Sequence, residues 1–134
     1  MRENKLKHLE FIQGVVNRLS TNSFLLKGWS VGLVAALFAL AAKDANTRFL
    51  LLVFIPIMIF WGLDGYCLWQ ERLYRALYRY VRLLPEEKTD FCMSTEKVKD
   101  KKGLSWLNAT FSKTVLFFHG ALMLSAIIVT YSLK

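Results

Sequence analysis

The sequence predicts an all-α membrane protein: three transmembrane helices, an N-terminal amphipathic helix, and a second span that continues as a long cytoplasmic helix. Apolar residues make up 54% of the 134 residues, yet the formal net charge is +8, so apolar and charged residues must be segregated along the chain. Three apolar stretches, 24–42, 49–69 and 114–133, approach the roughly 20 residues needed to cross a bilayer. The length predicts a single membrane domain over 1–134.

The N-terminal segment, 1–23, has the pattern of an amphipathic helix. Its apolar residues recur every three or four positions at Leu6, Leu9, Ile12, Val16 and Leu19, which places them on one helical face. The helix lies at the membrane surface or packs on other cytoplasmic parts of the chain. The sequence "STNS" at 20–23 is typical of a turn and a helix N-cap, and predicts a break before the first span.

The second span has no helix breaker between Gln70 and Leu84, so one helix is predicted from Phe49 to Leu84. Pro56 lies within it, where a kink is expected, and Pro85 ends it. The helix is about 54 Å long at 1.5 Å per residue, against about 30 Å of hydrocarbon, so several turns project into water. A polar connection, 43–48, precedes it. A cytoplasmic loop, 85–113, follows, with Trp106 at headgroup depth.

The distribution of basic residues predicts the orientation. Residues 1–27 carry five Lys and Arg and residues 70–113 carry ten, whereas 43–48 carries two and the C-terminal end one. By the positive-inside rule, the N terminus and the 85–113 loop are cytoplasmic and the C terminus is outside. The expected location is the bacterial inner membrane, crossed three times.

Each predicted span contributes one ionisable residue at a similar depth: Lys27, Asp64 and His119. At 1.5 Å per residue, all three lie roughly 6–9 Å below the cytoplasmic surface. Because Asp64 is too short to reach water from there, it needs a partner, and Lys27 or His119 is expected. Two interpretations stay open. The layer is an ion pair that fixes helix register, or it is a polar ring or gate in an assembly.

Two pairs of glycines lie near this layer: Gly28 and Gly32 on the first span, and Gly62 and Gly65 on the second. Small residues allow helix backbones to approach closely in membranes. The four glycines are therefore predicted to mark helix-packing faces.

The projecting helix carries arginines at a spacing of 3, 4 and 3, which puts them on one face. Three interpretations stay open. The arginines bind anionic lipid headgroups, pair with acidic residues within an assembly, or contact nucleic acid or a nucleotide. The residues are Arg72, Arg75, Arg79 and Arg82.

No catalytic motif accompanies these features. The sequence has no G-x-S-x-G, H-E-x-x-H or P-loop pattern, and Cys67 and Cys92 lack metal-binding spacing. We therefore expect a protein that is not an enzyme and has no catalytic residues, cofactor or metal.

The motifs "HLEFIQ…NRL…NSF…KGW" and "FW…LD…Y…L…QER", over about residues 7–80, resemble small helical membrane proteins of bacterial antiphage defence loci. The arrangement is similar to the pore-forming membrane accessory protein of type VI-B RNA-targeting CRISPR systems. The resemblance implies a homo-oligomer and makes the following residues motif positions: Asn17, Ser23, Lys27, Trp29, Asp64, Glu71 and Arg72.

Three spans cannot enclose an aqueous path alone, so permeation requires a ring of subunits. The expected function is an oligomeric inner-membrane effector of antiphage defence that disrupts or permeabilises the membrane when triggered from the cytoplasmic side. The expected partners are membrane lipids, further copies of the chain, and a defence-system protein or nucleotide signal. The alternative is a membrane-anchored scaffold or regulatory subunit that binds a partner through its basic cytoplasmic helix, without permeation.

Overall fold

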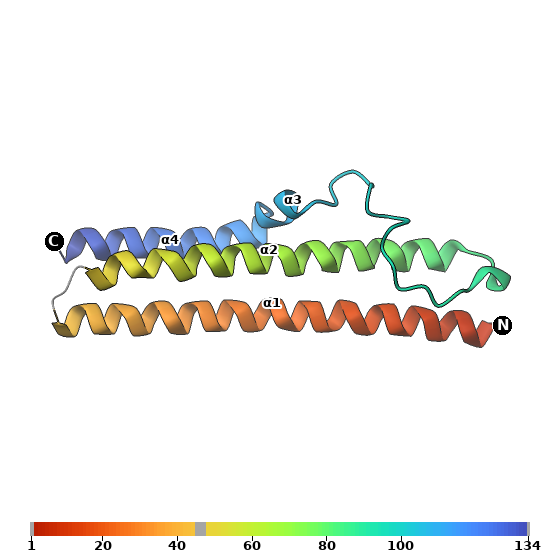
Figure 1. Cartoon of the computed structure of the whole chain (residues 1–134), viewed down its shortest axis with the longest axis horizontal. Helices are drawn as coiled ribbons and strands as arrows, with labels where there is room; N and C mark the ends of the chain where they lie inside the picture. Colours follow the sequence, from red (N-terminus) through yellow and green to blue (C-terminus); the bar gives the residue numbers. More distant parts are fainter. Residues whose placement is uncertain (1, 45–47, 134) are drawn as a thin grey trace.

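The computed structural model describes residues 2–44 and 48–133, and within them the fold is all-α. The α-helices are α1 (Arg2–Asp44), α2 (Arg48–Leu83), α3 (Trp106–Thr110) and α4 (Lys113–Ser132), with a 3₁₀ turn, η1 (Glu86–Lys88). Figure 1 shows α1 and α2 side by side and antiparallel over most of their length, with α4 beside α2 at the end away from the N terminus. Three helices, α1, α2 and α4, are long and apolar enough to cross a membrane, which indicates a multi-pass membrane protein.

The first helix runs without interruption through 20–23, so the predicted turn there is wrong. Helix α1 extends from Arg2 to Asp44, and the N-terminal amphipathic helix and the first span are one element. Ser, Thr and Asn are only moderately poor helix formers, each about 0.5 kcal/mol worse than Ala. Packing along α2 outweighs this preference, because Val16 and Ser30, on either side of the polar stretch, are both buried.

The other predicted spans agree closely with the structure. Helix α2 begins and ends one residue before the predicted bounds and passes through Pro56, and α4 begins at Lys113 and ends at Ser132. In the predicted connection 43–48, Lys43 and Asp44 belong to α1 and Arg48 to α2, whereas positions 45–47 lie outside the described residues. The short helix α3 occupies part of the predicted 85–113 loop.

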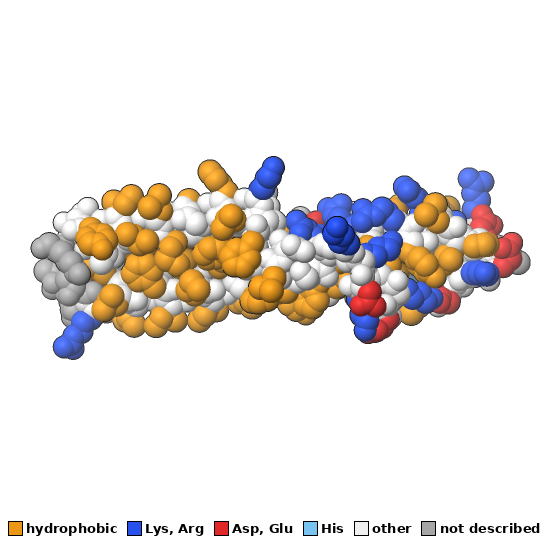
Figure 2. Space-filling model, turned by 90° about the horizontal axis from the view of Figure 1, so that it is seen from above, with side chains coloured by type: hydrophobic (Ala, Val, Ile, Leu, Met, Phe, Trp, Pro, Cys, Tyr) orange, Lys and Arg blue, Asp and Glu red, His pale blue; other side chains and the backbone are white. Residues whose placement is uncertain are grey.

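Apolar side chains cover the half of the molecule that contains α4. Figure 2 shows hydrophobic side chains over that half and most Lys, Arg, Asp and Glu side chains over the other. The buried cluster of the apolar half joins three helices and consists of Val34, Val53, Ile57 and Ala126. Large apolar residues such as Leu51, Met58 and Phe117 remain exposed there, as expected for a surface that faces lipid.

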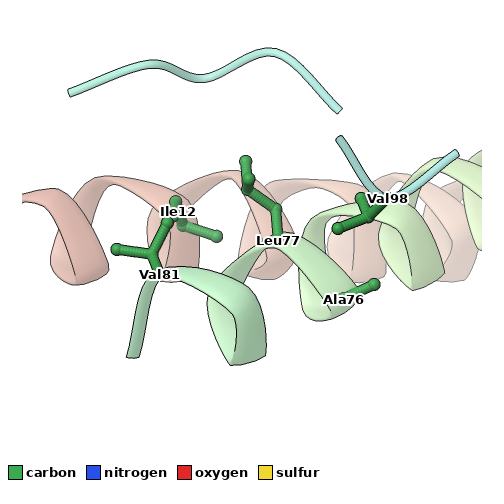
Figure 3. Packing of buried hydrophobic residues seen from close by; sticks show 5 residues of the cluster. All are labelled: Ile12, Ala76, Leu77, Val81 and Val98. Carbon is green, nitrogen blue, oxygen red and sulfur yellow. The ribbon is translucent and has the colours of Figure 1, made fainter. Parts of the chain in front are cut away.

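The other half is a stalk formed by residues 2–22 of α1 and 70–83 of α2, together with the connecting segment 84–105. It has its own hydrophobic core, shown in Figure 3, which consists of Ile12, Ala76, Leu77, Val81 and Val98. Because one member, Val98, comes from the connecting segment, that segment is part of the packed structure and not a free loop.

Three side-chain hydrogen bonds from α1 and α2 attach the connecting segment to these helices. The Lys5 ammonium donates to the Leu84 carbonyl at 2.8 Å, and the indole of Trp69 donates to the Leu104 carbonyl at 3.3 Å. His8 is 1% exposed, and its Nε2 lies 3.1 Å from the Cys92 carbonyl. A carbonyl only accepts, so this nitrogen carries the hydrogen. The segment therefore lies along the stalk from the end of α2 back towards α3.

Candidate functional site

The carboxylate of Asp64 is the centre of a buried polar cluster that joins all three long helices. The Asp64 side chain is fully buried. Its Oδ2 lies 2.7 Å from the Lys27 ammonium of α1 and 2.8 Å from Nε2 of His119 on α4, and its Oδ1 accepts a hydrogen bond from the Ser23 hydroxyl. An ionised carboxylate is an acceptor with about four lone-pair positions, so three donors satisfy most of its capacity.

Ser23 and Lys27 reach Asp64 together because they lie one helical turn apart on α1. The Lys27 ammonium also donates to the Ser23 hydroxyl, at 2.8 Å. The unbroken helix through 20–23 creates this arrangement, since positions four residues apart share a face only in a continuous helix. The turn predicted there would have placed Ser23 outside the helix that carries Lys27.

The cluster is organised to neutralise charge. Lys27 balances the charge of Asp64, and His119 donates from Nε2 while its buried Nδ1 has no hydrogen-bond partner among the described residues. The Ser23 hydroxyl donates a hydrogen bond to the Asp64 carboxylate, and Lys27 is the ion-pair partner of that carboxylate. Neither side chain is therefore an activated nucleophile or base. The three donors thus hold the Asp64 carboxylate inside the apolar half.

Helix α3 covers α2 beside this cluster through two reciprocal indole hydrogen bonds. Trp61 of α2 donates to the Thr110 carbonyl of α3 at 2.9 Å, and Trp106 of α3 donates to the Gly62 carbonyl of α2 at 3.0 Å. The Trp61 ring also stacks on His119, with centroids 6.1 Å apart and planes 10° apart. The same tryptophan thus contacts both the cluster and its cover.

Gly65 permits the close approach of α3 to α2. A Cβ at Gly65 would overlap the Thr110 hydroxyl and lie 2.9 Å from the Thr110 Cα, closer than real Cβ contacts. At Gly62, a Cβ would make an ordinary 3.6 Å contact with the Trp106 ring. Within the described residues, the α2 glycines thus lie against another helix, which is α3.

The α1 glycines are different. A Cβ at Gly28 or Gly32 would meet nothing within 4 Å in the described structure. The two glycines instead form part of an open apolar groove of about 500 Å³ on the outer face of α1, together with Phe24, Leu25, Trp29 and Leu33. Their packing against another helix is not seen among residues 2–44 and 48–133 and stays a prediction.

The four arginines of α2 do not form a single network. Arg75 pairs with Glu71 of the same helix at 2.8 Å, and the structure shows no ion pair for Arg72, Arg79 or Arg82 among the described residues. The acidic residues Asp90 and Glu96 pair with lysines of their own segment, at 3.4 and 2.6 Å. The arginine face thus remains available to an outside ligand.

The structure brings together Lys27, Asp64 and His119, which the sequence placed at one depth. The contacts of Ser23, Trp61 and Trp106 were not predicted from spacing. The contact of Ser23 could have been predicted, because Ser23 precedes Lys27 by four residues and therefore shares its helical face. The indole contacts could not, since they depend on the position of α3. No group of three or more metal-ligating side chains lies close together among residues 2–44 and 48–133.

No protein-family model matches the chain, no curated protein matches its sequence, and no solved structure matches it.

Proposed function

We propose that the chain is the subunit of an oligomeric effector of the bacterial inner membrane, which permeabilises the membrane when its stalk is engaged from the cytoplasmic side. The N terminus is cytoplasmic and the C terminus outside, and antiphage defence is the role that the sequence resemblance implies. The observation that carries the proposal is the sequestered cluster of Ser23, Lys27, Asp64 and His119, which joins three apolar helices.

The physical reason lies in the continuity of α1 and α2. Each runs without interruption from the stalk into the apolar half, so a displacement of one helix along the other in the stalk also moves Lys27 relative to Asp64. An unpaired charge in the hydrocarbon layer costs several kcal/mol. The separated groups would therefore seek water or a neighbouring subunit, and a ring of subunits would then line a polar path.

The groove on α1 supports the oligomeric part of the proposal. Glycines weaken a helix by about 1 kcal/mol each relative to Ala, and a Cβ at Gly28 or Gly32 would meet none of the described residues within 4 Å. Small residues on an exposed face of a membrane helix allow a second helix to approach closely.

A second candidate is a membrane-anchored scaffold or regulatory subunit. It is favoured by the complete burial of Asp64 within one chain, because a single subunit already satisfies its charge. In that case the cluster fixes helix register, the stalk binds a partner, and nothing permeates.

Reconstitution of the full chain into liposomes, with an ion-sensitive dye inside, separates these functions. Native mass spectrometry of the same preparation gives the subunit number. Lys27→Met breaks the cluster, and Lys43→Met is the matched control because Lys43 lies exposed on the same helix. We expect oligomers, and faster ion flux with Lys27→Met than with Lys43→Met. If the chain is monomeric and neither variant permeabilises the liposomes, the effector function is contradicted and the scaffold function is favoured.

A further inference from the structure

Arg75 and Arg79 line a groove between α1 and α2 in the stalk. The cavity at this point has a volume of about 170 Å³ and is lined by Gln13, Val16, Arg75, Tyr78 and Arg79. A second cavity of about 450 Å³ shares Gln13 and Tyr78 with the first, and its lining also includes Leu6, Leu9, Glu10, Gly14 and Asn17. Together they form a groove that is basic at Arg75 and Arg79 and apolar at Leu6 and Leu9. Glu10 also lines it, and this carboxylate is paired with Lys7 at 3.2 Å.

The basic end has unused hydrogen-bond donors. Arg79 is exposed and makes no ion pair or hydrogen bond with the described residues, and Arg75 engages Glu71 through Nε and Nη2, at 3.0 and 2.8 Å. At this end two guanidinium groups stand against the single carboxylate of Glu71, and Lys7 already balances the charge of Glu10 in the adjoining cavity, so the site is positive. Guanidinium groups match the geometry of phosphate oxygens and often bind them bidentately.

We propose that this groove binds the phosphate group of an anionic ligand, held between Arg75 and Arg79. The amide of Gln13, from α1, donates to Asn17 with one of its two hydrogens, so the other is available to the ligand. The remainder of the ligand extends over the Tyr78 ring towards the apolar end at Leu6 and Leu9. The larger cavity, of about 450 Å³, lies within the range of small-molecule sites.

Two sources can supply such a phosphate: a phospholipid headgroup or a free compound. Arg79 lies 15 residues beyond Asp64 in α2, about 22 Å along the helix. With Asp64 roughly 6–9 Å inside the hydrocarbon edge, Arg79 lies about 13–16 Å outside it, whereas the headgroup layer is about 5–8 Å thick. The apolar end of the groove also points away from the membrane, because Lys5 bonds Leu84 at the far end of the stalk. Both facts favour a free phosphate compound over a phospholipid headgroup as the ligand.

The inference rests on the proposed function for what the ligand does after binding. The groove has one wall on α1 and the other on α2, so an occupied site changes the fit of the helices that carry Lys27 and Asp64. Binding itself is independent of any flux and is measured separately.

The test uses the full chain. In one arm, ATP and inorganic pyrophosphate are titrated against the chain in phosphatidylcholine nanodiscs. In the other, native mass spectrometry measures the retention of phosphatidylglycerol by the detergent-solubilised chain. The variants are Arg79→Gln and the matched control Arg82→Gln, which removes the same charge from the same helix but does not line the groove. Circular dichroism verifies that both variants fold.

We expect Arg79→Gln to weaken binding at least about ten-fold, since charge-assisted hydrogen bonds are lost, and Arg82→Gln to weaken it less than about three-fold. A loss of binding in Arg79→Gln but not in Arg82→Gln supports the site. The arm that shows this loss identifies the ligand as a free phosphate compound or a phospholipid headgroup. Equal losses in the two variants would overturn the site in favour of diffuse attraction, and so would the absence of binding to all three probes. Binding without flux would leave the site intact and contradict the effector.

Discussion

Asp64 and His119 lie 55 residues apart in sequence, yet Oδ2 of the first is 2.8 Å from Nε2 of the second, and neither side chain is exposed. The contact links α4 to α2 at the depth where Lys27 of α1 also binds Asp64. One carboxylate therefore connects the three long helices, and its removal should affect both the stability and the arrangement of the bundle.

We expect Asp64→Asn to lower the free energy of unfolding by about 2–4 kcal/mol. Removing one partner of a buried ion pair costs about 3–5 kcal/mol, and the loss is reduced here because Lys27 retains 24% side-chain exposure. The measurement is the thermal unfolding midpoint in mild detergent. Asp90→Asn is the control, because it removes an exposed ion pair, and exposed pairs contribute little to stability. Similar shifts in both variants would refute the central role of Asp64.

A double-mutant cycle should show strong coupling between Lys27 and Asp64. Lys27→Met leaves a buried carboxylate without its cation, and Asp64→Leu leaves an ammonium without its anion, so each variant should be less stable than the original chain. The double variant leaves neither charge, and apolar replacements of buried pairs are often neutral or stabilising. We expect it to be at least about 1 kcal/mol more stable than the less stable single variant. Additive effects in the unfolding measurements would exclude the pair as a unit.

Gly65→Ala should displace α3 from α2, because the added methyl group would overlap Thr110. Overpacking typically costs about 1–3 kcal/mol. Gly120→Ala is the matched control, since a Cβ there meets nothing within 4 Å, and Ala is the better helix former. Unfolding midpoints compare stability, and hydrogen exchange at residues 106–110 reports on α3. An unchanged exchange pattern in Gly65→Ala would show that this close approach is dispensable.

The connecting segment should loosen in acid. The backbone N–H of Cys92 donates to the Asp90 carboxylate at 3.0 Å, and this bond, with a smaller contribution from Lys97, holds the Asp90 pKa below its ordinary value of 3.8. A lowered folded-state pKa gives stability that is present above the unfolded value and lost as pH falls through the folded one. We therefore expect the amide resonance of Cys92 to titrate below pH 3.8. Asp90→Asn should abolish that titration, and a midpoint above the ordinary value would contradict the contact.

Much of this molecule follows from the sequence because hydropathy and charge act locally. The apolar lengths predicted the spans of α2 and α4 to within about one residue at most ends, and depth counting placed Lys27, Asp64 and His119 at one level. A helix has a fixed rise per residue, so residue number converts directly into position along its axis. This conversion needs no knowledge of the neighbouring helices.

Only the tertiary structure decided the rest. The local preference of 20–23 for a turn was overridden, because packing against α2 stabilises a continuous α1 more than those side chains weaken it. The position of α3 also cannot be predicted from the local sequence. It depends on the close approach that Gly65 permits, and on hydrogen bonds from the Trp61 and Trp106 indoles to carbonyls 49 and 44 residues away. The sequence determined which residues share a depth. The packing of α1, α3 and α4 around α2 determined which of them touch, because contacts between helices depend on rotation about each axis as well as on height.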